Sequence, residues 1–283
     1  MIPLKFDYEV AESVDHAVQL LGQHGEEAKL LAGGHSLLPI MKLRLAAPAV
    51  LVDIGRLGDL SYVRDAGDHI AIGALTRHAD VEHSDLLREQ CGLLAYTASL
   101  VGDPQVRHRG TIGGSVAHGD PASDLPSVLL ALDADFVVRG SGGERTVAAR
   151  DFFQDYLQTA LAPDEVLTEI RVPKLGPNAG WSYQKFNRRA QDWAVVGVAA
   201  VVERQNGSIS SARIGLTNMG STPLRASAVE SALSGADASS VAEAAQSAAE
   251  GTSPASDVAA SDEFRRHLAR VLTRRALEEA LSR

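Results

Sequence analysis

In Leu30-Leu31-Ala32-Gly33-Gly34-His35-Ser36-Leu37, a short apolar run ends at a glycine pair, and a serine follows within two residues of the pair. The same form returns in Arg109-Gly110-Thr111-Ile112-Gly113-Gly114-Ser115. Glycine permits positive φ and lets a ligand approach the main chain closely, and successive N–H groups in such a turn bind anions. Residues 32–37 and 109–115, hereafter the first and second glycine segments, therefore predict two halves of a clasp around a dinucleotide's pyrophosphate, provided the fold brings them together.

Neither glycine segment fits the common nucleotide-binding motifs. No Gly-Lys-Ser/Thr follows, which excludes a P-loop, and neither segment reads G-x-G-x-x-G, which excludes a Rossmann turn. Taken singly, each segment is also compatible with an ordinary turn that depends on glycine flexibility. Their repetition favours a binding site, and it predicts a different nucleotide-binding fold.

Composition narrows the classes of function. Apolar residues make up 45% and charged residues 22% of the 283 residues, which is ordinary for a globular protein. The net charge of −9 argues against a nucleic-acid partner. The longest apolar run, residues 194–202, is too short to cross a bilayer, and without a signal peptide the cytoplasm is the default location. Cys91 is the only cysteine, so we expect no internal disulfide, no cysteine-ligated metal and no iron–sulfur cluster in this chain. The nine histidines show no metal-ligand spacing, so no other metal site is expected.

Hydrophobic periodicity predicts an α+β chain. Helical spacing begins at Val14 behind a capping Ser13, and strands are expected at 28–32 and 49–54 with a helix or turn at 37–45 between them. The second glycine segment lies in a long polar connection, residues 102–124, that has few helix or strand signals of its own. Connections of that length inside compact domains are usually functional.

A glycine- and proline-containing linker at 176–180 divides the chain. We expect one domain at 1–176, with subdomains of about 1–55 and 56–176, and a second domain at 177–283. The second domain is predicted to hold three antiparallel strands followed by a helical bundle, with the strands at 182–186, 194–203 and 210–217.

Both glycine segments, together with Asp120-Pro121-Ala122-Ser123-Asp124-Leu125-Pro126, resemble the FAD-binding medium subunits of the molybdenum hydroxylases, the xanthine dehydrogenase family. Within that family the chain is most similar to medium subunits of aerobic carbon monoxide dehydrogenases, and the resemblance covers its whole length. It implies a two-subdomain FAD-binding domain of the vanillyl-alcohol-oxidase (PCMH) type and a C-terminal flavoprotein domain. It also implies non-covalent FAD, although distant flavin oxidases attach FAD to a histidine at the place of His35.

The resemblance further implies which residues bind FAD. The glycine segments hold the pyrophosphate, the acidic motif holds the ribityl and adenosine side, Leu167 packs on the adenine, and Lys185 reaches the flavin from the second domain. For Asp124, helix capping with a cofactor hydroxyl contact is favoured over a paired-carboxylate role with Asp120. Stacking on the flavin ring is left open between aliphatic contacts, Tyr183 and Trp193. The complete set of expected contacts is Ala32, Gly33, Gly34, His35, Ser36, Leu37, Thr111, Ile112, Gly113, Gly114, Ser115, His118, Ser123, Asp124, Leu167 and Lys185.

The expected activity is electron transfer, with no catalytic residue in the usual sense. The resemblance implies partners: a large subunit with the molybdenum cofactor and a small subunit with two [2Fe–2S] clusters, assembled as a dimer of heterotrimers. Electrons would reach FAD one at a time and leave to quinone or oxygen, with a contact at the inner face of the membrane left open. The alternatives are a related hydroxylase for N-heterocycles, purines or aldehydes, a self-sufficient flavin oxidoreductase, and a non-catalytic nucleotide-binding protein.

Overall fold

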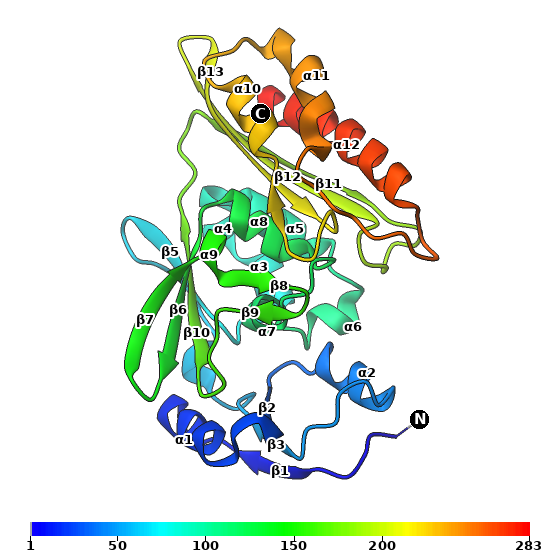
Figure 1. Ribbon diagram of the computed structural model, residues 1–283. Helices are drawn as coiled ribbons and strands as arrows, with labels where there is room; N and C mark the ends of the chain where they lie inside the picture. The colour runs from blue at the N-terminus through cyan, green and yellow to red at the C-terminus, as the bar shows by residue number, and fades with distance from the viewer. Residues whose placement is uncertain (1) are drawn as a thin grey trace.

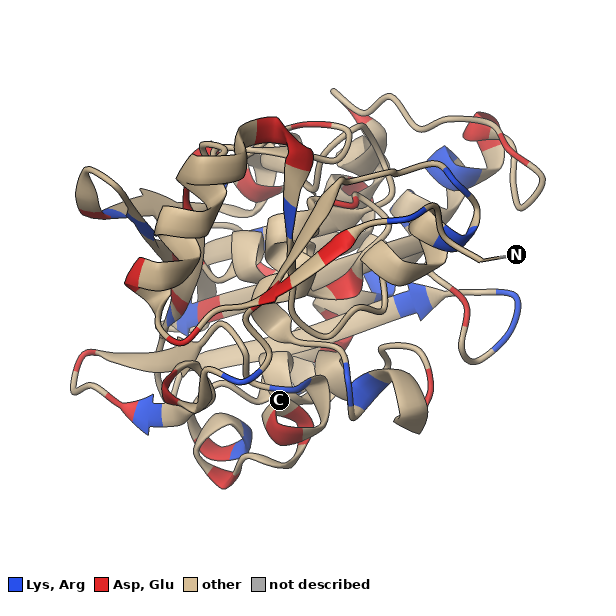
Figure 2. Cartoon of the chain, turned by 90° about the horizontal axis from the view of Figure 1, so that it is seen from below, with Lys and Arg blue, Asp and Glu red and all other residues tan. Residues whose placement is uncertain are grey.

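A computed structural model describes residues 2–283, and its elements form three successive units (Figure 1). The N-terminal unit lies at the bottom of the view, the middle unit at the centre, and the C-terminal domain at the top. Seen from below, Lys and Arg positions are interspersed with Asp and Glu positions along the elements (Figure 2). Within that described range, no helix is long and apolar enough to span a membrane.

The N-terminal unit is a small parallel sheet with one main helix. Strands β1 (Asp7–Val10), β3 (Val50–Asp53) and β2 (Ala28–Leu31) lie in the order β1-β3-β2. Helix α1 (Val14–His24) begins where the Ser13 hydroxyl accepts a hydrogen bond from the His16 N–H at 3.0 Å, and its apolar face packs on the sheet. Helix α2 (Leu37–Lys42) follows the first glycine segment. The expected helix and both expected strands are therefore present, and β1 is an additional strand.

The middle unit is a five-stranded antiparallel sheet covered by short helices. Its strand order is β4-β5-β10-β6-β7. The strands are β4 (Val63–Asp65), β5 (His69–Gly73), β6 (Asp135–Gly140), β7 (Gly143–Ala148) and β10 (Val166–Pro173), with a separate hairpin of β8 (Phe153–Asp155) and β9 (Gln158–Thr159). The helices are α3 (His78–His83), α4 (Asp85–Gln90), α5 (Gly92–Ser99), α6 (Pro104–Arg107), α7 (Ile112–His118), α8 (Asp124–Ala131) and α9 (Ala149–Phe152).

The polar connection at 102–124 contains more regular structure than its composition indicates. It includes α6 and α7, and the second glycine segment runs into the first turn of α7. Two glycines lower the helix propensity of that turn by about 1 kcal/mol each, which hides it from sequence patterns. Capping by Thr111 and tertiary packing stabilise it instead.

The C-terminal domain differs from the prediction in both of its layers. Its antiparallel sheet has four strands in the order β11-β12-β13-β14, not three. They are β11 (Ala179–Phe186), β12 (Val196–Gln205), β13 (Ser208–Thr217) and β14 (Leu224–Arg225). The two residues of β14 are too few to produce a periodic pattern. In place of a bundle, one long helix, α12 (Asp262–Ser282), lies along the sheet (Figure 1), beside the short α10 (Ser227–Leu233) and α11 (Val241–Ala244).

Short 3-10 helices complete the chain at η1 (Gly25–Glu27), η2 (Gly58–Leu60), η3 (Ala238–Ser240) and η4 (Ala245–Ala249).

The C-terminal sheet is a middle layer that is buried on both faces. On β12, Ala199 and Val201 join the core of the middle unit, while Val198, Ala200 and Val202 join a separate core under α10 and α12. This double burial explains why residues 194–202 form a continuous apolar run rather than the alternation that a half-exposed strand would show. The same burial ties the C-terminal domain to the middle unit.

We predict that Gly180→Ala destabilises the chain strongly. A Cβ at Gly180 would lie 1.8 Å from the carbonyl oxygen of Ala280, so α12 would have to move off β11. Overpacking of this kind costs about 1–3 kcal/mol. Gly176→Ala is the matched control, because its Cβ would enter open space. Urea unfolding checks the prediction, and an equal midpoint for the two variants would contradict it.

Candidate functional site

The first glycine segment presents an uninterrupted row of free backbone donors. It follows β2, turns at Gly34 with φ of +76°, and leads into α2. Among residues 2–283, the backbone N–H groups of five successive residues, Gly33 to Leu37, have no hydrogen-bond acceptor. The side chain of Ser36 at the start of α2 makes no capping hydrogen bond. Such a row of donors is suited to an anion.

The second glycine segment is built differently, because its amides are used within the protein. The N–H of Ile112 donates to the Thr76 carbonyl at 3.0 Å, and that of Gly113 donates to the Ala74 carbonyl at 2.9 Å. The N–H of Gly114 donates to the Thr111 hydroxyl oxygen at 3.1 Å. The two segments are therefore not the symmetric pair of donor loops that the sequence predicts. The second segment contributes a close-packed wall and hydroxyl groups.

Direct backbone packing joins the two segments. A Cβ at Gly33 would lie 2.3 Å from the Arg109 carbonyl oxygen and 2.8 Å from the Cα of Gly110. A Cβ at Gly113 would lie 2.5 Å from the Cβ of Ala74, where α7 meets the end of β5. Glycine at positions 33 and 113 thus allows neighbouring segments of the backbone to pack closely against each other.

A cavity of about 880 Å³ opens at these segments, which is the size of a cofactor site. It runs from α1 and β2 in the N-terminal unit to the end of β11 and the following loop in the C-terminal domain. Fifteen of the sixteen residues predicted from the sequence line it: Ala32, Gly33, Gly34, His35, Ser36, Leu37, Thr111, Gly113, Gly114, Ser115, His118, Ser123, Asp124, Leu167 and Lys185. The exception is Ile112, whose fully buried side chain belongs to the middle unit's core.

Several lining residues carry no motif and were not predicted. They include Lys29 on β2, Val101, the β8–β9 hairpin residues Gln158 and Thr159, and Gln191 and Asp192 after β11. Trp193, which the sequence left as one of several stacking candidates, lines the cavity and is 67% exposed. Tyr183 does not line it, since its ring is 2% exposed and its hydroxyl is bonded inside the protein.

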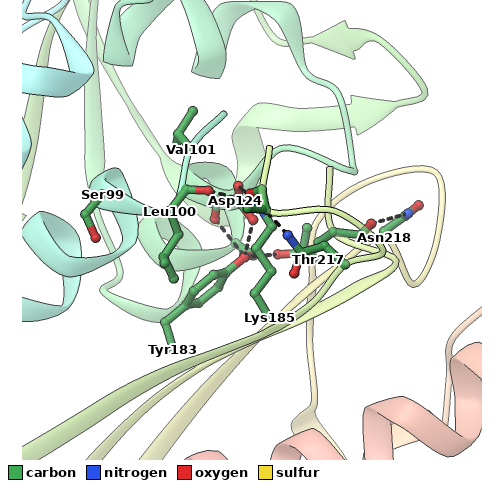
Figure 3. A network of polar contacts seen from close by, with 12 residues as sticks. Ser99, Leu100, Val101, Asp124, Tyr183, Lys185, Thr217 and Asn218 are labelled. Atoms are coloured by element: carbon green, nitrogen blue, oxygen red, sulfur yellow. Dashed lines mark hydrogen bonds and ion pairs between the residues drawn. The ribbon is translucent and has the colours of Figure 1, made fainter. Parts of the chain in front are cut away.

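A buried polar network joins the middle unit to the C-terminal domain at the edge of the cavity (Figure 3). The carboxylate of Asp124 accepts hydrogen bonds from the Tyr183 hydroxyl at 2.7 Å and from the Lys185 ammonium at 2.8 Å. Lys185 also donates to the Leu100 carbonyl at 3.0 Å, and both charged side chains are 5% exposed. Burial raises the pKa of the Asp124 carboxyl, and Lys185 opposes that rise by favouring the charged form.

The predicted capping role of Asp124 is wrong. Ser123 occupies the N-cap position of α8, without a side-chain capping bond, and Asp124 is the first helical residue. The Asp120 carboxylate accepts from the Ala122 N–H at 2.9 Å, which closes a local turn. The capping expectation failed because both oxygens of Asp124 are bonded by residues some sixty positions later in the chain, which no local pattern reveals.

We predict that Lys185→Met destabilises the protein by about 3–5 kcal/mol, because it leaves the Asp124 carboxylate buried without its cation. Asp124→Asn combined with Lys185→Met should recover much of this loss, since the neutral amide needs no counter-charge. Denaturant unfolding of both variants and the parent provides the measurement. A double variant no more stable than Lys185→Met alone would show that the ion pair is not the cause.

Comparison with known proteins identifies relatives along the full chain. The family model "FAD binding domain in molybdopterin dehydrogenase" matches residues 4–175, and "CO dehydrogenase flavoprotein C-terminal domain" matches residues 181–280. The chain is 44% identical to the carbon monoxide dehydrogenase medium chain of Hydrogenophaga pseudoflava, over 100% of this chain and 99% of the relative. It is 40% identical to the 6-hydroxypseudooxynicotine dehydrogenase complex subunit alpha of Paenarthrobacter nicotinovorans, over 100% and 97%.

Solved structures agree with these relatives. A chain of the carbon monoxide dehydrogenase from Hydrogenophaga pseudoflava, in a form lacking the Mo-pyranopterin moiety, superposes with a TM-score of 0.98 at 45% identity, covering 100% of this chain and 99% of that one. A chain of quinoline 2-oxidoreductase from Pseudomonas putida 86 superposes with a TM-score of 0.93 at 31% identity, over 100% and 99%.

Proposed function

This chain belongs to the family of FAD-binding subunits of molybdopterin dehydrogenases, and on that premise we propose that it is the medium subunit of a carbon monoxide dehydrogenase. It would hold FAD in the cavity and pass electrons from a partner subunit to a terminal acceptor. The row of free N–H groups at Gly33–Leu37, which opens on a cavity lined by all three units, carries the FAD-binding part of this proposal, and the full-length identity of 44% supports the choice of carbon monoxide dehydrogenase.

The donors at the first glycine segment fit a pyrophosphate. Five unpaired amides offer hydrogen bonds that a doubly charged group can accept without displacing any protein contact. Ser36, Thr111 and Ser115 also line the cavity, and each carries a hydroxyl group that would add a donor. When bound, FAD supplies the one- and two-electron chemistry, while the protein supplies binding, orientation and electrostatic tuning.

The two ends of the cavity suit the two ends of FAD. The family resemblance places the adenine against Leu167, and Leu21 of α1 and Leu30 of β2 also line the cavity. The flavin ring then lies at the junction with the C-terminal domain, where Lys185 is held by Asp124 and the Leu100 carbonyl. A fixed cation there would favour the anionic reduced flavin. Trp193 would cover the ring, because it is the lining aromatic residue at that end of the cavity.

We predict that Trp193→Ala raises the fluorescence of bound FAD severalfold, because a stacked indole quenches the flavin and a methyl group does not. Trp193→Phe keeps a planar ring and should stay close to the parent. Steady-state and time-resolved emission of the desalted proteins checks this. If Trp193→Ala has the emission of the parent, the flavin is covered by some other group.

The partners we propose are a large subunit with the molybdenum cofactor and a small subunit with two [2Fe–2S] clusters, in a dimer of heterotrimers. The single cysteine, Cys91, is fully buried in the middle unit's core, and clusters require several cysteine ligands. Quinone or oxygen is the acceptor we favour. The proposed location is the cytoplasm, with contact at the inner face of the membrane if quinone is the acceptor.

A related hydroxylase is the second candidate. The full-length identity to the 6-hydroxypseudooxynicotine dehydrogenase subunit and the superposition with quinoline 2-oxidoreductase favour it. Both readings assign the same role to this chain, because the substrate would be oxidised on the large subunit. The substrate preference of the assembled complex therefore decides between the two candidates.

We predict that the full chain, purified without partner subunits, is yellow with one FAD and no iron, and that carbon monoxide bleaches it only after the large and small subunits are added. Gly33→Ala should lose FAD, because the new Cβ would collide with the Arg109 carbonyl, whereas Gly58→Ala points into open space and should keep it. Absorbance after desalting measures bound FAD and its bleaching, and metal analysis measures iron.

A colourless parent chain would contradict the FAD proposal. Bleaching by a small organic substrate without partners would indicate a self-sufficient oxidoreductase. Bleaching of the assembled complex by an N-heterocycle and not by carbon monoxide would favour the related hydroxylase.

A further inference from the structure

His78, the first residue of α3, is a buried imidazole at the cavity that no motif identifies. It is 4% exposed, and it is one of the cavity-lining residues. Its ring lies directly behind the second glycine segment: a Cβ at Gly110 would be 2.7 Å from the His78 Cδ2 and 3.0 Å from its Nε2. Gly110 in turn packs on Gly33, the first residue of the free N–H row. Gly110 therefore contacts both the imidazole and the first glycine segment, and all three line the same cavity.

The imidazole is without hydrogen-bond partners inside the protein. Its Nδ1 is enclosed and unpaired within residues 2–283, and the ring makes no other hydrogen bond in that range. Leaving a buried polar group unsatisfied costs about 1–3 kcal/mol. Nδ1 is enclosed, so a ligand in the cavity meets the ring at Nε2, which makes no hydrogen bond to any residue in 2–283 and is not among the enclosed unpaired atoms.

The surroundings determine the charge and tautomer of the ring. Burial, followed by the nearby His35, Arg107 and Arg77, lowers the pKa of His78 to about 4, so the ring is neutral near pH 7. A neutral imidazole carries one N–H and one bare nitrogen. Placing the proton on enclosed Nδ1 would strand a donor, so the proton belongs on Nε2, on the side of Gly110. Of the two arginines nearby, Arg107 is paired with Glu82 at 2.8 Å, and Arg77 contributes the positive charge that attracts an anion to this region.

We propose that His78 donates its Nε2–H to a phosphate oxygen of the bound dinucleotide and so completes the donor set begun by Gly33–Leu37. The proposal rests on the proposed function, because it requires FAD in this cavity. It assigns the pyrophosphate a side-chain ligand from α3, in addition to the backbone donors of the first segment. The inference stands on the place of His78 in the cavity wall, on its contact with Gly110 beside Gly33, and on the ring without a hydrogen-bond partner among residues 2–283.

His78→Leu and His78→Gln in the full chain test this inference. Leucine removes the donor and keeps an apolar group of similar reach, so FAD affinity should fall about ten-fold or more, as expected for one hydrogen bond to a charged group. Glutamine can place an amide N–H near the position of Nε2 and should recover most of the affinity. The FAD-free Leu variant should unfold at the parent's temperature or higher, because an unsatisfied polar group has been removed.

The measurements are fluorescence titration with FAD, thermal unfolding without FAD, and 31P NMR of the bound cofactor. A pyrophosphate resonance should shift between the parent and the saturated Leu variant. Unchanged FAD affinity, unchanged 31P resonances, or a loss of FAD-free stability that parallels the loss of affinity would overturn the role of His78. Failure of the parent chain itself to bind FAD would instead overturn the proposed function, and this inference with it.

Discussion

Gly33 packs directly on the Arg109–Gly110 backbone, and this contact joins the N-terminal unit to the middle unit at the place where the cavity forms. Neither Gly33 nor Gly110 has room for a side chain, because a Cβ at Gly33 would meet the Arg109 carbonyl oxygen and a Cβ at Gly110 would meet the His78 ring. Because the second segment uses its own amides to hold α7 against the end of β5, it is a rigid surface. The first segment lies on that surface, and its backbone N–H groups have no acceptor within residues 2–283, so they can donate hydrogen bonds to a ligand.

The opposite end of the cavity depends on a different interaction. Asp124 receives Tyr183 and Lys185 from β11, and the sheet that carries them is buried on both faces. Such a buried charged network is weak evidence for stability, but it fixes β11 relative to α8, because a shift of either element would separate Lys185 from Asp124. The flavin end of the site would therefore be built across a junction that is held by both apolar packing and an ion pair. Lys185 and Trp193 reach the cavity only because of this junction.

Much of this architecture could be predicted from local patterns. The Ser13 cap, the spacing of α1, and the apolar runs that become β2, β3 and β12 follow from rules that operate over a few residues. Predictions failed where tertiary contacts outweighed local preference. Helix α7 forms despite two glycines, β14 pairs although it has only two residues, and Asp124 serves an ion pair rather than a cap. The partners of Asp124 lie far away in the chain; α7 combines the local Thr111 cap with contacts to Ala74 and Thr76, and β14 pairs with the neighbouring β13.

Residue types and their spacing pointed to a dinucleotide site at the two glycine segments, because the backbone requirements of such motifs are local. The fifteen cavity-lining positions came from the family resemblance that these motifs carry, and some of them, such as Leu167 and Lys185, lie outside any motif. Only the folded chain showed that the two segments are unequal, that Ile112 faces the core, and that His78 and Trp193 belong to the cavity. Which amides remain free, and which buried side chains remain unpaired, depends on every group that packs against them. The free amides and unpaired side chains are therefore determined only when the three units pack together.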